Sequence, residues 1–287
     1  KQTDFVKDFI KLFNLFVTQD PDDKSIFIFT PQTDFYKRDI SQVIDWTDKI
    51  DHSEEITFTP MSQLTAKEYT LSWKPDKDHW NELYTAQNKE VYGQVTYISD
   101  TDIIANKEKI EMLFSPAIMT RLKNSSVLCP AIYKMELVAG VMTRKPDKFN
   151  SRLLIWGGTQ DAGHSIHLLN FNGTEYGNVS VYPFAGHIDN PEDPSFDLNF
   201  GNVNAAIPTA TVNQFSRYWG RGLREAASKD GKLVSCSMYL KPEDIEALDF
   251  AALYKVSFQY FRLNKIEGFN PFSLGTSKVE LIKVITL

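Results

Sequence analysis

The stretch 233–287 constrains the fold more than any other, because its apolar residues alternate with more polar ones. This period of two is typical of a strand that buries one face. The first alternating set is Val234, Cys236, Met238 and Leu240. Two further strands are predicted at 256–266 and 278–285, and Pro242 is expected to open a short helix after the first strand. Three strands joined by short connections predict an antiparallel sheet that must curl or pair to protect its edges.

Composition narrows the class of protein. A length of 287 residues allows two domains or three small ones, and a hydrophobic fraction of 42% is enough for buried cores. The 20 Phe and 12 Tyr residues favour β-rich packing. A net charge of −6 without a long basic run argues against sequence-specific or backbone binding of nucleic acid. We expect no membrane-spanning segment and no signal peptide, and the Lys at position 1 suggests a piece of a longer protein.

The first half of the chain is predicted to combine one helix with several strands. A helix is expected at 3–16, with an apolar stripe that packs on the protein's own sheet or, alternatively, fits a partner. The stripe comprises Phe5, Phe9, Leu12, Phe13 and Phe16. Strands are expected at 25–29, 56–59, 68–73, 91–97 and 109–114, with a short helix or excursion at 76–84.

The second half is predicted to begin with an irregular region at 116–151. Short strands follow at 153–156 and 165–169, and a second long helix is expected at 209–228. Three arginines share one side of that helix, which favours a solvated basic face over an anion or subunit contact. They are Arg217, Arg221 and Arg224.

These elements predict a mainly β (α+β) fold of two or more small antiparallel barrel or sandwich domains with two longer helices. The predicted domains are an N-terminal helix with a β domain at 1–115 and a middle β domain at 116–205. A helix with a C-terminal β-barrel segment follows at 206–287.

The segment 182–201 holds the residues most suggestive of a metal site. His187, Asp189, Asp193 and Asp197 lie within eleven positions, shortly after His164 and His167. Oxygen-rich loops bind calcium, and His with carboxylates binds zinc. The spacing fits neither an EF-hand nor HExxH, however, and Asn-Pro and Asp-Pro pairs form turns. We therefore predict a structural loop and no metal site, with these four residues as weak candidates only.

No catalytic or cofactor-binding residue is predicted. The chain lacks GxSxG, a phosphate-binding GK[ST] loop and CxxC. Acidic residues such as Asp161 and Glu175 leave paired-carboxylate glycan cleavage open, because their separations cannot be read from sequence. Cys129 and Cys236 are expected to be buried free thiols, with a disulfide as the alternative.

Several blocks, in one order, resemble tail or baseplate (tail-hub-like) structural proteins of phages and prophages of gut bacteria. The blocks lie at 30–36, 45–51, 55–64, 67–69, 90–94, 109–116, 182–201, 240–256 and 259–284. The last of these includes QYFRLNKIEGFNPF and KVELIKV. The chain departs from the pattern mainly at 117–150.

The resemblance implies a structural subunit of a tail tip or baseplate hub, assembled in the host bacterial cytoplasm and located in the virion tail. Its partners would be copies of itself, in a trimer or hexamer ring, and other tail proteins. The acidic balance would keep passing DNA from binding if the excess faced the lumen. The alternative is a tail-associated or secreted glycan-binding module or cell-wall hydrolase that uses the loops 164–197 with Trp156 and Tyr182.

Overall fold

The computed structural model describes residues 2–37, 39–100, 105–123, 125–169, 172–203, 207–272 and 275–285. The protein is mainly β, with 38% strand and 19% helix, as the sequence predicts. Contacts gather the chain into two compact units, each assembled from three segments. Unit 1 comprises residues 1–12, 70–96 and 109–217, and unit 2 comprises residues 13–69, 97–108 and 218–287.

These interleaved units differ from the three consecutive domains predicted at 1–115, 116–205 and 206–287. A sequence pattern indicates the type of a local element, whereas a domain depends on which distant elements touch. The boundary predicted at 205/206 lies outside the described residues. At three places the chain passes from one unit to the other within a strand. These three strands form one sheet, in the order β6–β5–β7. Its strands are β5 (Glu68–Ser72), β6 (Val95–Ile98) and β7 (Lys107–Glu111).

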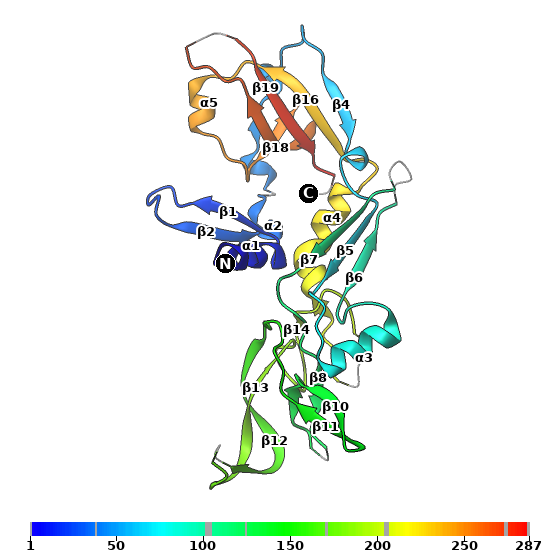
Figure 1. Cartoon of the computed structure of the whole chain (residues 1–287). Coiled ribbons are helices and arrows are strands. Elements are labelled where there is room, and N and C mark those ends of the chain that lie inside the picture. The colour runs from blue at the N-terminus through cyan, green and yellow to red at the C-terminus, as the bar shows by residue number, and fades with distance from the viewer. Residues whose placement is uncertain are drawn as a thin grey trace. The chain divides into compact units, whose positions relative to one another are not determined.

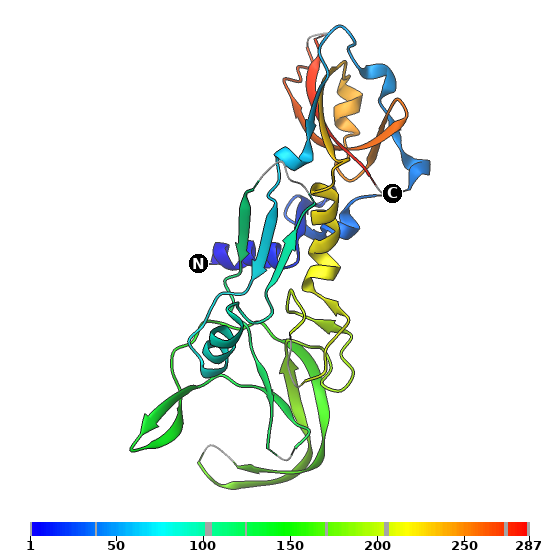
Figure 2. The same cartoon turned by 90° about the vertical axis from the view of Figure 1, so that its right-hand side faces the viewer.

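Unit 2 is built on a six-stranded sheet in the order β3–β17–β18–β19–β16–β4 (Figure 1). The strands are β3 (Ile44–Asp45), β4 (Thr57–Pro60), β16 (Lys232–Met238), β17 (Leu253–Val256), β18 (Gln259–Glu267) and β19 (Ser277–Lys283). Neighbours run antiparallel, except that β3 is parallel to β17. In Figure 2, the yellow, orange and red strands of this sheet curve around a common interior.

The segment 44–51 joins the two ends of this sheet. The Trp46 N–H donates to the Lys255 carbonyl on β17, at 2.8 Å. At the other end of the segment, the Asp51 N–H donates to the Ser237 carbonyl on β16, also at 2.8 Å. Main-chain bonds at both ends close the sheet over this stretch, which protects strand edges that would otherwise be open.

The alternating residues of the C-terminal stretch form the core inside the sheet, as predicted. The buried members are Trp46, Val234, Cys236, Met238, Leu240, Ala252, Tyr254, Phe261, Leu263, Val279 and Leu281. Trp46 is 2% exposed, and its ring centroid lies 4.3 Å from that of Tyr254. The predicted helix after Pro242 is α5 (Pro242–Glu246).

The strand predicted at 256–266 is β18, which begins three residues later, and β17 before it was not predicted. β17 ends at Val256 and β18 begins at Gln259, with Ser257 at φ 55° between them. Tight hairpin turns usually carry Asn-Gly or a similar pair, because those residues adopt positive φ at low cost. Because Ser257–Phe258 lacks that signal, the sequence prediction missed the turn and began the strand at Val256.

The rest of unit 2 is a hairpin with short helices. β1 (Leu15–Gln19) pairs with β2 (Phe27–Pro31) in a separate two-stranded sheet. The helices are α2 (Gln32–Phe35), the 3-10 turns Ile40–Gln42, Thr47–Lys49 and Met61–Gln63, and α4 (Gly220–Ala226). Phe16 of β1 stacks on Phe35 with ring centroids 4.5 Å apart, so one face of the hairpin is covered by α2.

Unit 1 combines two helices with short sheets and three hairpins. The helices are α1 (Gln2–Leu12) and α3 (His79–Asn88). The hairpins are β8 (Met119–Arg121) with β9 (Leu128–Pro130), β10 (Lys134–Val138) with β11 (Val141–Lys145), and β12 (Ile155–Leu169) with β13 (Glu175–Gly186). A short parallel pair joins β14 (Phe196–Asp197) to β15 (Val212–Asn213). The prediction of an irregular region at 116–151 was therefore wrong.

Both long helices predicted from the sequence are shorter in the structure. The first ends at Leu12, and Asn14 at φ 47° turns the chain into β1. The second is replaced by β15, a π-helical turn at Phe215–Trp219 and α4. α1 buries Asp8 and Leu12, whereas Phe5 is 49% exposed. Of the predicted stripe within α1, Leu12 is therefore buried, whereas Phe5 and Phe9 are exposed. None of the helices in the described ranges has the length and apolar composition needed to cross a bilayer.

We expect Trp46→Ala to lower the free energy of unfolding of unit 2 by about 3–5 kcal/mol, because it leaves a large cavity beside Tyr254. Hydrogen exchange of the β16 and β17 amides measures this loss. The matched control is Phe258→Ala, since Phe258 is 98% exposed and its truncation should change stability by less than about 0.5 kcal/mol. Equal effects of the two variants would contradict the closure of the sheet by 44–51.

Because Asp8 is buried, we expect the free energy of unfolding to depend on pH. Burial raises its pKa, although main-chain hydrogen bonds from Leu113 and Phe114 oppose the rise. The unfolded chain therefore loses this proton at lower pH, and the free energy of unfolding falls as pH rises from 3.8 through the folded pKa. Asp8→Asn should remove this fall, so its advantage over the wild type should grow with pH in urea titrations. Glu246→Gln, at an exposed position, is the control and should leave the slope unchanged.

Candidate functional site

A cavity in unit 1 lies between α3 and β8. It has a volume of about 360 Å³ and a mainly apolar lining. The lining residues are Trp80, Leu83, Tyr84, Gln87, Tyr92, Ile118, Met119, Thr120, Arg121 and Ile207. A concave apolar site with a few polar groups is the usual form of a ligand pocket.

The helical repeat explains why α3 lines the cavity. Trp80, Leu83, Tyr84 and Gln87 lie at positions i, i+3, i+4 and i+7, which fall on one face of a helix. The rings of Tyr84 and Tyr92 meet edge to face, with centroids 5.0 Å apart. The opposite wall is the run Ile118–Arg121, which contains β8. The cavity therefore depends on α3 staying beside β8.

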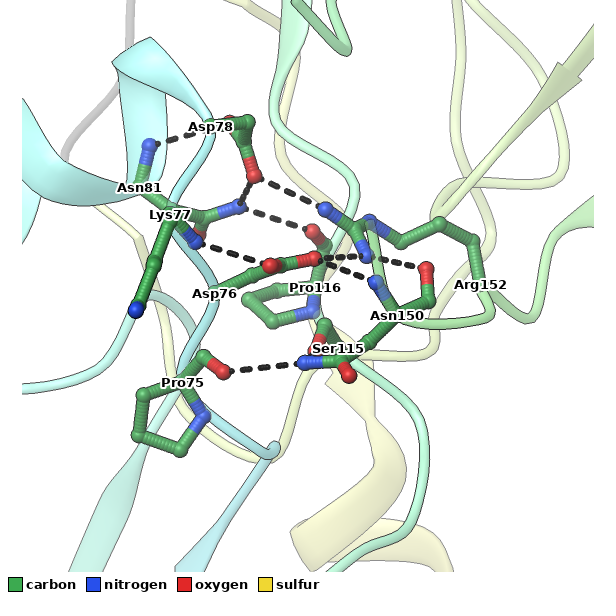
Figure 3. Close-up of polar contacts among 9 residues, drawn as sticks. All are labelled: Pro75, Asp76, Lys77, Asp78, Asn81, Ser115, Pro116, Asn150 and Arg152. Atoms are coloured by element: carbon green, nitrogen blue, oxygen red, sulfur yellow. Dashed lines mark hydrogen bonds and ion pairs between the residues drawn. The ribbon is translucent and has the colours of Figure 1, made fainter. Parts of the chain in front are cut away.

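A buried ion cluster holds the N-terminus of α3 in place (Figure 3). The Arg152 guanidinium contacts the Asp76 carboxylate at 2.5 Å and the Asp78 carboxylate at 2.8 Å. All three side chains are at most 6% exposed. Asp78 is also the N-cap of α3, where its carboxylate accepts the Asn81 N–H at 3.2 Å. Arg152 thus binds the residue that caps the helix.

The same cluster reaches the segment that leads into β8. The Asn81 side-chain amide donates to Asp78 at 2.6 Å and to the Pro116 carbonyl at 3.1 Å. The Asn150 side-chain amide donates to the Ser115 hydroxyl at 3.0 Å (Figure 3). One connected set of polar contacts therefore fixes both walls of the cavity at their starting points.

A second buried network lies behind Tyr92. His187 Nδ1 is 2.9 Å from the Asp197 carboxylate, so Nδ1 carries the hydrogen and donates it. His187 Nε2 is then an acceptor, and the Tyr92 hydroxyl lies 3.3 Å from it. The Asp197 carboxylate also accepts the Asn199 N–H at 2.8 Å. The side chains of His187 and Asp197 are 4% and 5% exposed.

Close packing against Gly93 completes this network. The Asn199 side-chain oxygen accepts the Trp73 indole N–H at 3.0 Å. A Cβ at Gly93 would lie 2.2 Å from that oxygen, and Gly93 has φ +73°. Only glycine fits there without displacing Asn199.

The surroundings of Tyr92 keep its hydroxyl protonated. Burial raises the pKa of Tyr92 far above its usual value, and the nearby Asp197 charge raises it further. The Tyr92 phenol therefore serves as a hydrogen-bond donor to His187. The side chains of His187 and Asp197 are almost fully buried and have little contact with solvent.

The four weak metal candidates do not form one group. His187 and Asp197 bond to each other, whereas Asp189 accepts the N–H groups of Ser195 and Phe196 at 2.9 and 3.2 Å. Asp193 donates its N–H to the Asn190 side chain in a neighbouring turn, at 3.3 Å. Among the described residues, no group of three or more His, Cys, Asp or Glu side chains could hold a metal ion.

The other residues singled out from the sequence occupy separate places. His164 Nδ1 lies 2.8 Å from the Ala162 carbonyl, and His167 Nδ1 lies 3.0 Å from the Asn178 side chain. Asp161 accepts the Gly163 N–H, and Glu175 lies 3.5 Å from His167. Trp156 is 66% exposed, whereas Tyr182 is 9% exposed. Cys129 and Cys236 are both free thiols.

The three arginines predicted to share a basic face have different surroundings. Arg217 lies over the Phe196 ring at 5.4 Å, within unit 1. Arg221 pairs with Glu225 at 2.9 Å, within unit 2, and Arg224 is exposed. A continuous solvated basic face is therefore not formed, because the predicted helix that would align these residues is broken.

Sequence reasoning missed the cavity and the Arg152 cluster. Asp76 and Asp78 were assigned to a short helix or excursion, and Arg152 lies 74 positions beyond Asp78. The only local signal was Asp78 before an amphipathic run, which is a helix N-cap pattern. No family model, curated protein or solved structure matches the chain.

We expect Arg152→Met to lower the free energy of unfolding of unit 1 by about 3–5 kcal/mol, because two buried carboxylates lose their partner. Adding Asp76→Asn and Asp78→Asn should recover part of this loss, since the amides carry no charge. Urea titrations measure both effects. The control is Lys109→Met, whose exposed pair with Glu111 should contribute less than about 1 kcal/mol. No recovery in the triple variant would contradict the electrostatic explanation.

Proposed function

We propose that this chain is a structural component of a phage or prophage tail tip or baseplate hub. In this role it assembles with copies of itself and with other tail proteins. The observation that carries the proposal is a set of three two-stranded hairpins with exposed apolar side chains. These hairpins are β1–β2 in unit 2 and β10–β11 and β12–β13 in unit 1.

The exposed apolar side chains on these hairpins are large. Phe27 is 56% exposed on β2, Leu137 is 69% exposed on β10, and Trp156 is 66% exposed on β12. β10–β11 and β12–β13 also project from the body of unit 1 (Figures 1 and 2). Exposed apolar surface of this kind marks sites where proteins associate.

Hairpin stability supports the same function. A two-stranded hairpin is marginally stable in water by itself, because too little apolar surface is buried. A hairpin that extends from a domain is therefore stabilised when a neighbouring subunit packs on it or adds a strand. Subunits of a ring or tube provide such neighbours in a fixed geometry.

The local roles of the acidic residues and histidines agree with a structural protein. His187 and Asp197 bond to each other inside unit 1, and Asp189 caps a turn. Asp76 and Asp78 neutralise Arg152 and cap α3. Each of these side chains is accounted for by an internal contact that stabilises the fold.

The cavity between α3 and β8 favours one alternative, a glycan-binding module. Trp80, Tyr84 and Tyr92 provide aromatic surfaces for sugar rings, and Gln87 and Arg121 provide polar groups. A glycan array would separate the two functions. Binding that is lost in Tyr84→Ala and retained in the control Trp156→Ala would favour the alternative.

Immunogold electron microscopy of particles from the source culture tests the proposed function. We expect an antibody against this chain to label one end of the tail in intact particles. The control is the same preparation with antibody pre-adsorbed on the purified chain. Particles that lack the chain, by labelling and by mass spectrometry, would contradict the proposal.

A further inference from the structure

Two of the exposed hairpins have complementary surfaces. α2 packs on one face of the hairpin β1–β2, and the other face is exposed. The exposed face carries Val17, Phe27 and Phe29, which are 42%, 56% and 47% exposed. Val17 lies directly opposite Phe29 in the strand register, so the three side chains form one apolar patch. We call it the β1–β2 face.

The turn of this hairpin is acidic. Three aspartates and one lysine occur between the strands: Asp20, Asp22, Asp23 and Lys24. Hydrogen bonds from Ser25 lower the pKa of Asp23, so this carboxyl is ionised near neutral pH. The described residues form no ion pair with Asp20, Asp22 or Asp23. The turn therefore carries a net negative charge that no ion pair among the described residues neutralises.

The hairpin β10–β11 has the opposite arrangement. Its tip is apolar, and the cross-strand pairs Leu137–Met142 and Val138–Val141 are 45–69% exposed. The turn residues Ala139 and Gly140 have φ 49° and 82°, which gives the tip a tight turn. Its base is basic, with four cations against two carboxylates. These are Lys134, Arg144, Lys145 and Lys148 against Glu136 and Asp147.

We propose that the tip of β10–β11 of one copy packs on the β1–β2 face of a second copy. The basic base of the first hairpin then lies over the acidic turn of the other. This inference rests on the proposed function, because a ring of copies requires a contact between two different surfaces of the subunit.

Each hairpin has a charged group within about 10 Å of its apolar residues. Arg144 lies two residues from Met142 on the same face of β11, about 7 Å along the strand at about 3.3 Å per residue. Asp20 lies three residues from Val17, about 10 Å away, in the turn that follows β1. Apolar contact and opposite charge can therefore be satisfied together in one orientation, which gives the contact specificity as well as affinity.

Sedimentation velocity of the full chain over a range of concentrations tests the charge complementarity. Asp22→Lys with Asp23→Asn should weaken self-association roughly tenfold or more, because cations would face the basic base. Asp23→Asn keeps the acceptor for Ser25. Adding Arg144→Glu and Lys148→Glu should restore association. The control, Asp230→Lys with Glu246→Gln, makes the same change in net charge at exposed positions and should have no effect.

Disulfide cross-linking tests the contact without relying on these charges. In a background of Cys129→Ser and Cys236→Ala, one chain carries Val17→Cys and another carries Met142→Cys. Under mild oxidation, the mixture should form a heterodimer that neither chain forms alone. This design excludes a link within one chain, since no chain carries both cysteines.

Either of two results would overturn the inference. One is a chain that stays monomeric at all concentrations, and the other is self-association that ignores the charge reversal and yields no mixed cross-link. Neither result would refute the proposed function, which stands or falls on labelling of the particle tail. Absence of the chain from particles, together with a mixed cross-link, would instead support the contact and refute the location.

Discussion

The contact of Arg152 with Asp76 and Asp78 is the interaction on which the architecture of unit 1 depends most. The three charged side chains are buried together, and each is at most 6% exposed. Their desolvation is offset only because the geometry lets one guanidinium serve two carboxylates and because Asn81 and Asn150 supply further hydrogen bonds. Since Asp78 also caps α3, this cluster sets where the helix begins and so where its aromatic face lies. The cavity beside β8 is a consequence of that placement.

The two units use polar and apolar residues differently from one another. Unit 2 encloses its apolar residues in a sheet closed by 44–51, with Trp46 and Tyr254 at the centre. Unit 1 extends the hairpins β10–β11 and β12–β13, on which Leu137 and Trp156 remain exposed. A two-stranded hairpin buries little apolar surface by itself, so we expect such hairpins to gain stability from contact with another subunit. The proposed assembly role rests on these hairpins.

The sequence predicted the fold best where one strand face is buried. Val234, Cys236 and Met238 alternate with half-buried residues, and all three lie in the core. The sequence prediction failed where one residue pattern is compatible with two different local structures. Phe5, Phe9 and Leu12 share a helical spacing, yet only Leu12 of the three is buried. The helix also buries Asp8, which the apolar pattern did not predict. The Ser257–Phe258 turn was missed because neither residue favours a turn by itself. The Arg152 cluster could not be predicted, because no local pattern reports a pairing across 74 positions.

The His187–Asp197 pair shows why residue types alone do not identify a catalytic site. A histidine bonded to a carboxylate is the arrangement that activates many nucleophiles, and here the third group is the Tyr92 hydroxyl. Here all three side chains are buried in the fold. Burial raises the pKa of Tyr92, so the phenol stays protonated and donates a hydrogen bond to His187. His187 then links the cavity wall at Tyr92 to the loop at Asp197 and Asn199, and the rigidity of that wall is what this polar network provides.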